Sequence, residues 1–339
     1  MPKAKIAIVK GPERKKNLLD AIKIIEPEVK KAIKEKNSKA LFIKVNTTCF
    51  DCLPSITHPK ALEAALKYFY PKFKEVIIGD SSDAFREKKN NPYSSLKKNF
   101  PKIKFSDLTE FKAKKYSAEM IGGSKKNAVV SLLPEEAFTV SLALPKTHDC
   151  YVFTGCTKNM FGCTIKGRGY VHGLRMMQRV FLNNVIESNK FKDKNLIKAL
   201  MAAKADLHLM DAFTGMQGNG PVLGEQIRLS YAMAGLDGIA VDSIASRLFC
   251  IEEVPYLKLL ERKGFGVGDA KKIELIKKGF KELDELKIKA RLHYTYKYQI
   301  IDPKEKFLFP VPDLNLIKDS LSFGLPAKFI KRMMTRNEE

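Results

Sequence analysis

The part of the sequence that decides the fold is residues 41–78, which contain LFIKV at 41–45, PKALEAALKYFY at 59–70 and VII at 76–78. The two short apolar runs predict buried strands. The middle stretch, whose apolar residues recur every three or four positions, predicts an amphipathic helix. A strand, a helix and a second strand in this order are typical of a parallel sheet. The sequence therefore predicts an α/β protein with a largely parallel, doubly wound sheet.

Apolar runs elsewhere in the chain extend this alternation. They predict strands at 6–9, 103–105, 129–133, 138–144 and 207–210, and helices at 18–34, 174–183, 196–204, 239–249 and 327–334. We expect two Rossmann-like lobes with a cleft between them, the first at residues 1–145 and the second, which carries the site loops, at 146–270. The amphipathic and basic stretch 271–289 predicts that residues 271–339 form a C-terminal helical segment that packs on the lobes.

The composition excludes several classes of protein. The chain has 339 residues and 45% hydrophobic content, which is enough for a folded core. No apolar run is long enough to cross a bilayer, and residues 1–16 lack the apolar core of a signal peptide, so we expect a cytoplasmic protein with no membrane partner. The net charge of +23 makes a nucleic-acid partner an alternative. The lysines are scattered along the chain, which favours solvated helix faces over a nucleic-acid-binding surface. The sequence leaves open whether the protein forms a homo-oligomer.

The segment PKTHDCYVFTGCTKNMFG at 145–162 has the greatest potential for chemistry, because it follows the predicted strand 138–144. Lys146 and Lys158 are cations that can hold an anionic substrate, and His148 is a proton carrier near neutral pH. Small and polar neighbours can add hydrogen bonds to a ligand: Thr154, Gly155, Thr157 and Asn159. We predict that Lys146, His148 and Lys158 are catalytic and that these neighbours bind the ligand.

Other candidate ligand-binding residues follow predicted strands. Lys44 and Asn46 close the strand at 41–45, and Asp80 closes the one at 76–78. The loop DAFTGMQGNGPVLG at 211–224 adds a further set: Asp211, Gly218 and Gly220. Glycines allow close approach of a ligand to the backbone. The loop lacks the lysine of a nucleotide-binding P-loop and the strict spacing of a dinucleotide-binding motif, which disfavours an ATPase or an ordinary NAD enzyme.

A metal site is a further alternative. His148, Cys150, Cys156 and Cys163 offer a mixed nitrogen and thiolate set that suits zinc, nickel or iron. Their spacing matches no zinc finger, and the closely spaced cysteines that hold ferredoxin clusters are absent from the sequence. A metal ion or an iron–sulfur cluster therefore stays open as the cofactor.

Six motifs in a fixed order carry a family resemblance. They are KVN at 44–46, GDSS at 79–82, LPKTH at 144–148, TGCTKNMFG at 154–162, the glycine-rich loop at 211–224 and GLDGIAVD at 235–242. Between residues 44 and 268 the chain resembles the uncharacterised family called domain of unknown function 362 (DUF362). Some members are fused to iron–sulfur ferredoxin modules, which implies an electron-transfer partner, although this chain lacks the ferredoxin cysteines.

A looser likeness concerns the mechanism. His148 and Lys158 have the spacing of a histidine and a lysine in the nickel-pincer lactate racemase family. This likeness implies that Lys158 anchors a cofactor and that the histidine handles hydride or protons.

The leading hypothesis is an enzyme, isomerase-like or oxidoreductase-like, that acts on a small carboxylate or phosphate. His148 would be the acid or base, and Lys146 and Lys158 would bind the anion. Two alternatives stay open: a basic nucleic-acid-binding protein, and a carrier of a metal or an iron–sulfur cluster.

Overall fold

The centre of the molecule is an eight-stranded sheet. We analysed a computed structural model that describes residues 3–48, 53–81, 91–120, 123–149, 151–172 and 185–292. The strand order is β15 (Ile273–Lys278), β1 (Ala4–Lys10), β14 (Tyr231–Gly235), β11 (Leu207–Met210), β7 (Phe138–Ala143), β2 (Ala40–Lys44), β3 (Glu75–Asp80) and β4 (Ile103–Asp107). Seven of these strands run parallel and β14 runs against both of its neighbours. The carboxyl ends of β2, β3, β7 and β11 therefore lie along the same edge.

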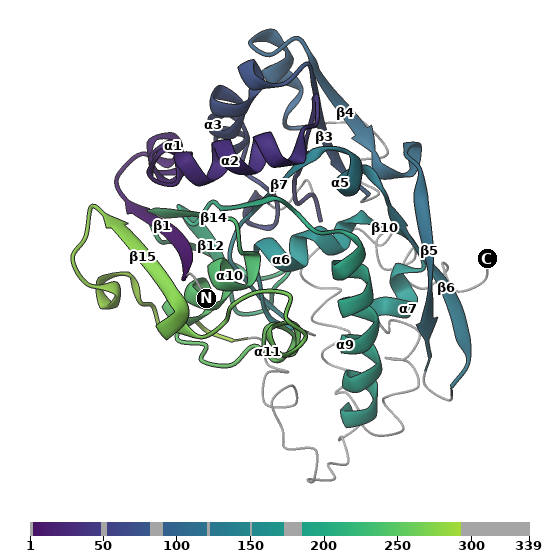
Figure 1. Ribbon diagram of the computed structural model, residues 1–339. Helices are drawn as coiled ribbons and strands as arrows, with labels where there is room; N and C mark the ends of the chain where they lie inside the picture. Colours follow the sequence, from purple (N-terminus) through teal and green to yellow (C-terminus); the bar gives the residue numbers. More distant parts are fainter. Residues whose placement is uncertain are drawn as a thin grey trace.

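Helices cover both faces of this sheet (Figure 1). One face carries α1 (Arg14–Ile24), α2 (Glu26–Lys36) and α3 (Pro59–Phe69); the other carries α6 (Cys156–Asn159), α9 (Val185–Ala202), α10 (Gly238–Leu248) and α11 (Pro255–Arg262). Alternate residues of β1 supply the two apolar clusters: Ile6 and Ile8 pack under α10 and α11, whereas Ala7 and Val9 pack under α1 and α3. Burial on both faces explains why the strands read as continuous apolar runs.

Two smaller sheets flank the main one. One has the order β10 (Thr164–Lys166), β6 (Lys125–Ser131), β5 (Ala113–Glu119). Its long β5–β6 hairpin contacts α9 and α7 (Arg168–His172) (Figure 1). The other has the order β13 (Glu225–Arg228), β12 (Thr214–Gln217), β8 (Lys146–His148), β9 (Val152–Thr154). Because β8 follows β7 and β12 follows β11, this second sheet begins at the carboxyl edge of the main sheet.

Short helical turns complete the described elements. They are α5 (Leu133–Glu136) and the 3₁₀ turns η1 (Leu53–Ser55), η2 (Tyr70–Lys72), η3 (Ser94–Lys98), η4 (Leu108–Glu110), η5 (Met160–Cys163), η6 (Ala270–Lys272) and η7 (Leu283–Leu286). Within the described ranges, every helix is too short or too polar to cross a membrane.

The structure confirms an α/β protein with a mostly parallel sheet, but it does not show two Rossmann-like lobes. Strands from before residue 145 and strands from after residue 146 join the same eight-stranded sheet. The predicted helix at 18–34 is two helices, because Pro27 lies in the first turn of α2 and cannot continue α1. The expectation of a helical segment from residue 271 is wrong for Ile273–Lys278, which form β15 beside β1.

The reason for this last error is that a short pattern of apolar and charged residues fits the period of a helix as well as that of a strand. Pairing with the open edge of β1 decides in favour of a strand. The predicted helices at 174–183 and 327–334 and most of the C-terminal segment lie outside the described residues.

Candidate functional site

A buried ion pair joins the ends of two neighbouring strands. Lys44 ends β2 and Asp80 ends β3, and the Lys44 Nζ lies 2.9 Å from Asp80 Oδ1. The two side chains are only 1% and 7% exposed. Because β2 and β3 are parallel and Lys44 pairs with Gly79, both side chains emerge at the carboxyl edge. This pair is the base of the candidate site.

The Asp80 carboxylate is held by hydrogen bonds as well as by charge. Its Oδ2 accepts bonds from the Thr47 amide and hydroxyl, at 3.0 and 2.7 Å, and its Oδ1 accepts one from the Ser81 amide at 2.7 Å. Burial favours the neutral acid, but the positive charge of Lys44 and the Thr47 bond outweigh it and keep the pKa of Asp80 below its usual value. Asp80 is therefore ionised at neutral pH.

Asn159 connects α6 to this pair. Its Nδ2 donates to the Lys44 carbonyl at 2.9 Å and to Ser141 Oγ at 3.1 Å, and its Oδ1 accepts from the Lys44 Nζ at 3.4 Å. Ser141 Oγ in turn donates to the Cys156 carbonyl at 2.7 Å. These bonds fix the short helix α6 against the ends of β2 and β7.

The other end of α6 is capped from α10. Both carboxylate oxygens of Asp242 accept backbone bonds, from Cys156 at 2.7 Å and from Thr157 at 2.8 Å. Gly155 precedes α6, and a Cβ there would collide with Asp242. Burial raises the pKa of Asp242 to about 7, although the bonds from Thr157 and Cys156 oppose the rise. Asp242 therefore positions α6 rather than facing a ligand.

Lys146 is a buried lysine on β8. Its Nζ donates to the Ser55 carbonyl at 2.9 Å and to Asn46 Oδ1 at 3.3 Å, and the residue is 2% exposed. Burial, with help from the nearby charges of Lys158 and Lys44, lowers the pKa of Lys146 to about 7, while Asp80 opposes the change. Near neutral pH this amine is thus present in both its charged and neutral forms.

His148 lies two residues further along β8. Its Nδ1 is 2.6 Å from Asp149 Oδ1, and its ring meets the Tyr151 ring edge-on, with 5.2 Å between centroids. Burial, and then the charge of Lys158, lower the pKa of His148 to about 4. At neutral pH His148 is therefore an uncharged imidazole beside the Asp149 carboxylate.

Lys158 and the turn after β8 complete the surroundings. The Lys158 Nζ lies over the Tyr151 ring, 4.8 Å from its centroid, and 5.6 Å from the centroid of Phe161. Val152 has a φ of 66°, an unfavourable left-handed conformation for a β-branched residue. Such strain is concentrated at functional sites. We call Lys44, Asp80, Lys146, His148, Lys158 and Asn159 the lysine cluster.

Comparison with known proteins supports a family assignment for this region. Residues 41–247, more than half of the chain, match the model of a family described as domain of unknown function (DUF362). The chain belongs to the DUF362 family. All six residues of the lysine cluster lie within the DUF362 region.

No curated protein matches this sequence. Among solved structures, a crystal structure of a Thermotoga maritima protein is similar over 67% of this chain and 56% of that chain, with 12% identity and a TM-score of 0.37. The chain thus spans just over half the length of that protein.

The DUF362 region brings together most of the predicted ligand-binding residues. Lys44 contacts Asp80 and Asn159, and Lys146 contacts Asn46. The charges of Lys44 and Asp80 act on Lys146, which brings the two groups into one site. Thr154 pairs with Lys146 in the β8–β9 ladder. The glycine-rich loop packs beside them, since Thr147 Oγ1 donates to the Gly218 carbonyl at 2.9 Å and a Cβ on Gly220 would collide with Thr147.

Asp211 has different partners from the other predicted residues. Its carboxylate forms an ion pair of 2.5 Å with Arg14, whose guanidinium also donates to Thr214 Oγ1 at 2.9 Å. Arg14 begins α1 and lies outside the DUF362 region, and its sequence context carried no signal that separates it from surface basic residues. Asp211 thus fixes the start of β12 to α1.

The described part of the predicted metal set is not gathered into a ligand cage. Burial raises the pKa of the Cys156 thiol well above its usual value and that of Cys163 to about 12, which favours the thiol over the metal-binding thiolate. Among the described residues no three histidine, cysteine or acidic side chains lie close enough to hold a metal ion. Cys150, the fourth member, lies outside the described residues, as do Cys49 and Cys52.

Two contributors to the site were not predicted. Ser141 supports Asn159, and its signal in the sequence is a polar residue within the buried run FTVSLA. Gly162 is the second, because a Cβ there would lie 2.5 Å from the Lys44 Nζ and 2.7 Å from Asp80 Oδ1. A lone glycine in the sequence carries no sign of such a close approach.

Proposed function

We propose that this protein is an enzyme that binds a small carboxylate or phosphate at the lysine cluster and transfers a proton there through Lys146. The observation that carries the proposal is convergence: basic, acidic and amide side chains from β2, β3, β8 and α6 meet at the carboxyl edge of the sheet. In open α/β sheets this edge is where ligands bind.

The roles of the lysines follow from their partners. Lys44 is paired with the ionised Asp80 and serves mainly to hold the edge together. The oxygens that Lys146 contacts, from Asn46 and Ser55, are uncharged. They do not neutralise its ammonium, which therefore still attracts an anion. Lys158 acts on the same space, since its charge influences both Lys146 and His148.

Proton transfer suits Lys146 better than His148. An acid or base works best when its pKa lies near the working pH. The pKa of Lys146 is about 7, whereas that of His148 is about 4, which leaves His148 neutral and a weak base. We therefore assign binding of the substrate anion to Lys158, removal of the proton to the neutral amine of Lys146, and orientation of the substrate to the neutral imidazole. The Lys146 ammonium that this step forms then stabilises the negative charge left on the substrate.

This chemistry is that of an isomerase that removes a proton beside a carboxylate or carbonyl group. An oxidoreductase would need a redox cofactor in addition to these side chains, whereas proton transfer by Lys146 needs none. The substrate would reach the lysine cluster at the point where the β8–β9 hairpin meets the main sheet. This location replaces the cleft between two lobes that the sequence predicted.

The test compares two lysine variants. Lys146→Met removes the proposed proton carrier and keeps an unbranched apolar side chain, and Lys115→Met removes an exposed lysine of β5 as a matched control. Thermal unfolding is recorded with acetate, malonate and inorganic phosphate from acid to alkaline pH. We expect at least one anion to stabilise the native protein and the control, with an effect that declines as pH rises through about 7 as Lys146 loses its charge.

Lys146→Met should lose this stabilisation. Stabilisation by phosphate that survives in Lys146→Met, or the absence of stabilisation by all three anions in the native protein, would refute the proposal. Salt-sensitive binding of single-stranded RNA that is equal in both variants would instead favour the nucleic-acid alternative.

A further inference from the structure

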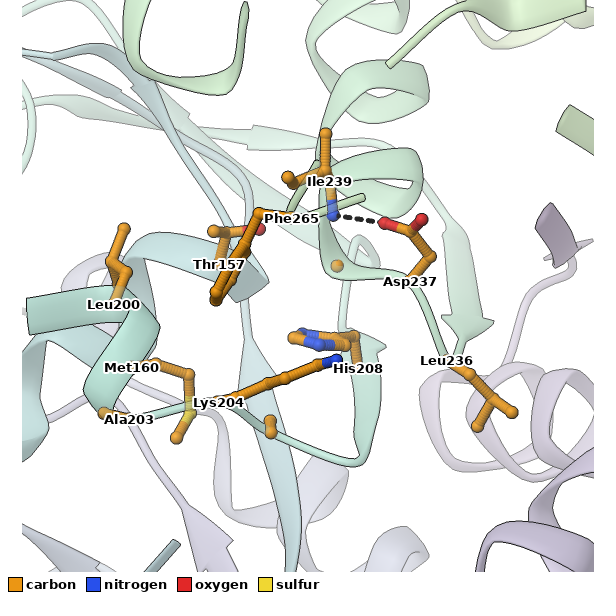
Figure 2. A pocket seen from close by; sticks show the side chains of 12 residues that line it. Thr157, Met160, Leu200, Ala203, Lys204, His208, Leu236, Asp237, Ile239 and Phe265 are labelled. Atoms are coloured by element: carbon orange, nitrogen blue, oxygen red, sulfur yellow. Dashed lines mark hydrogen bonds between the residues drawn. The ribbon is translucent and has the colours of Figure 1, made fainter. Parts of the chain in front are cut away.

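A second candidate site lies in a cavity on the α10 side of the main sheet. The cavity has a volume of about 100 Å³, larger than the roughly 10–15 Å³ that a single water needs. It is enclosed by the end of α9, by β11, by the start of α10 and by the residues around Phe265 (Figure 2). No residue of the lysine cluster lines it.

Two buried polar side chains line this cavity, His208 and Thr157, and the His208 ring is the larger of them. His208 is 6% exposed, and its Nδ1 is buried without a hydrogen-bond partner in the described part of the chain. The ring lies against the first residue of α10, because a Cβ on Gly238 would be 2.6 Å from His208 Nδ1. A buried nitrogen on a cavity wall without a partner is costly, and it indicates a missing hydrogen-bonding group.

Two charged side chains line the cavity, Lys204 and Asp237, and the Lys204 ammonium is the one that can attract an anion. Asp237 is already occupied, since its carboxylate accepts backbone bonds from Ile239, Ala240 and Val267 at 2.9, 3.0 and 2.8 Å. Figure 2 shows the Asp237 carboxylate turned toward the Ile239 nitrogen, whereas Lys204 extends along the side of His208. Lys204 is exposed, so its ammonium is available where the cavity meets solvent.

His208 can complement such an anion as a neutral donor. Burial lowers the pKa of His208 to about 3, and the charge of Lys204 acts in the same direction. The imidazole is therefore uncharged at neutral pH, with one N–H to donate.

The remaining wall contains the Thr157 hydroxyl and several apolar side chains. Leu200, Met160 and Phe265 line the cavity opposite the polar groups, and the Lys204 Nζ lies 6.0 Å from the centroid of Phe265. An inorganic anion would leave these side chains without contacts, whereas a short hydrocarbon chain would cover them.

We propose that this cavity binds a small organic monocarboxylate. The carboxylate lies between the Lys204 ammonium and the N–H of His208, and the hydrocarbon body packs on Leu200, Met160 and Phe265. This site is separate from the lysine cluster and does not depend on the function proposed for it.

The probe is butyrate, and the reporter is the Cε1–H resonance of His208, assigned from a His208→Gln variant. The chain has five histidines, so these resonances are few enough to resolve by NMR. We expect a saturable shift of the His208 resonance on titration with butyrate. Lys204→Met should weaken binding about tenfold or more, as expected for loss of a charged hydrogen bond, and Lys204→Arg should restore most of it.

Two further variants separate this site from others. Ala203→Leu places extra volume in the cavity without removing a polar group, and it should also abolish the shift. Lys115→Met removes an exposed lysine of β5 that belongs to neither site, and its His208 resonance should shift with butyrate as in the native protein.

Three results would overturn the proposal. The first is a His208 resonance that does not saturate with butyrate in the folded native protein. The second is unchanged affinity in Lys204→Met. The third is inorganic phosphate binding as tightly as butyrate, which would show that the apolar wall plays no part.

Discussion

Removal of Lys44 should destabilise the protein far more than removal of an exposed lysine that makes an equally short ion pair. In Lys44→Met the Asp80 carboxylate stays buried at 7% exposure, without the ammonium that lies 2.9 Å from it in the native protein. Its bonds from Thr47 and Ser81 remain, but they are dipoles and do not neutralise the charge.

The magnitude follows from this burial. Loss of one partner of a buried pair costs about 3–5 kcal/mol, because the other charge is left without compensation. Lys104 and Glu75 provide the control: they also join neighbouring strands, at 2.7 Å, but their side chains are 64% and 44% exposed. Lys104→Met should therefore cost less than about 1 kcal/mol.

The assay is urea unfolding at constant pH, and it includes Asp80→Asn and the double variant. We expect the double variant to lose about 1–3 kcal/mol less than the sum of the single losses, since removal of both charges leaves none uncompensated. The pKa of Asp80 is lowered in the folded state, so the contribution of the pair is complete above the unfolded pKa of about 3.8 and is lost as pH falls through the folded value. The Lys44→Met penalty should shrink only in acid. Equal penalties for Lys44→Met and Lys104→Met, or strictly additive losses, would refute the reasoning.

Two further predictions concern the support of the site. Asp242→Asn should remove a pH dependence of the free energy of unfolding. Because the pKa of Asp242 is raised to about 7, the native protein loses stability as pH rises from about 4 to 7, by up to about 1.4 kcal/mol per pH unit. Urea unfolding of the variant at a series of pH values should show a flatter profile. Gly162→Ala should cost about 1–3 kcal/mol through contact with Lys44 and Asp80, whereas Gly169→Ala on α7, with no atom within 4 Å of the new Cβ, should change the free energy of unfolding by less than about 1 kcal/mol. Equal effects of the two alanines would contradict the crowding at Gly162.

The main sheet was predictable where strands are buried on both faces. The apolar runs at 6–9, 41–45, 76–78 and 207–210 all form strands of the eight-stranded sheet. Strands with one exposed face or with many polar residues were missed, for example β5 and β13, since their residues are held by pairing with a neighbour and carry little apolar signal. The strand β15 was mistaken for a helix because its short pattern of apolar and charged residues fits a helix as well as a strand, and pairing with β1 decides between them.

The residues that lie together at this edge were predictable from the sequence, but their protonation states were not. Polar residues just after buried strands indicated Lys44, Asp80 and Lys146, and the structure joins them at one edge. The sequence favoured His148 as the acid or base because histidine titrates near neutral pH in water. Burial changes which side chain titrates near neutral pH, because it lowers the pKa of His148 to about 4 and that of Lys146 to about 7.

The sequence by itself determined the class of fold, the DUF362 membership and the segments that meet at the carboxyl edge, because each depends on local patterns along the chain. Only the tertiary structure decided that one sheet takes strands from the whole described chain, that Asp211 pairs with Arg14, and that His208 faces a cavity. These features depend on contacts between residues far apart in sequence, and on desolvation, which no local pattern records.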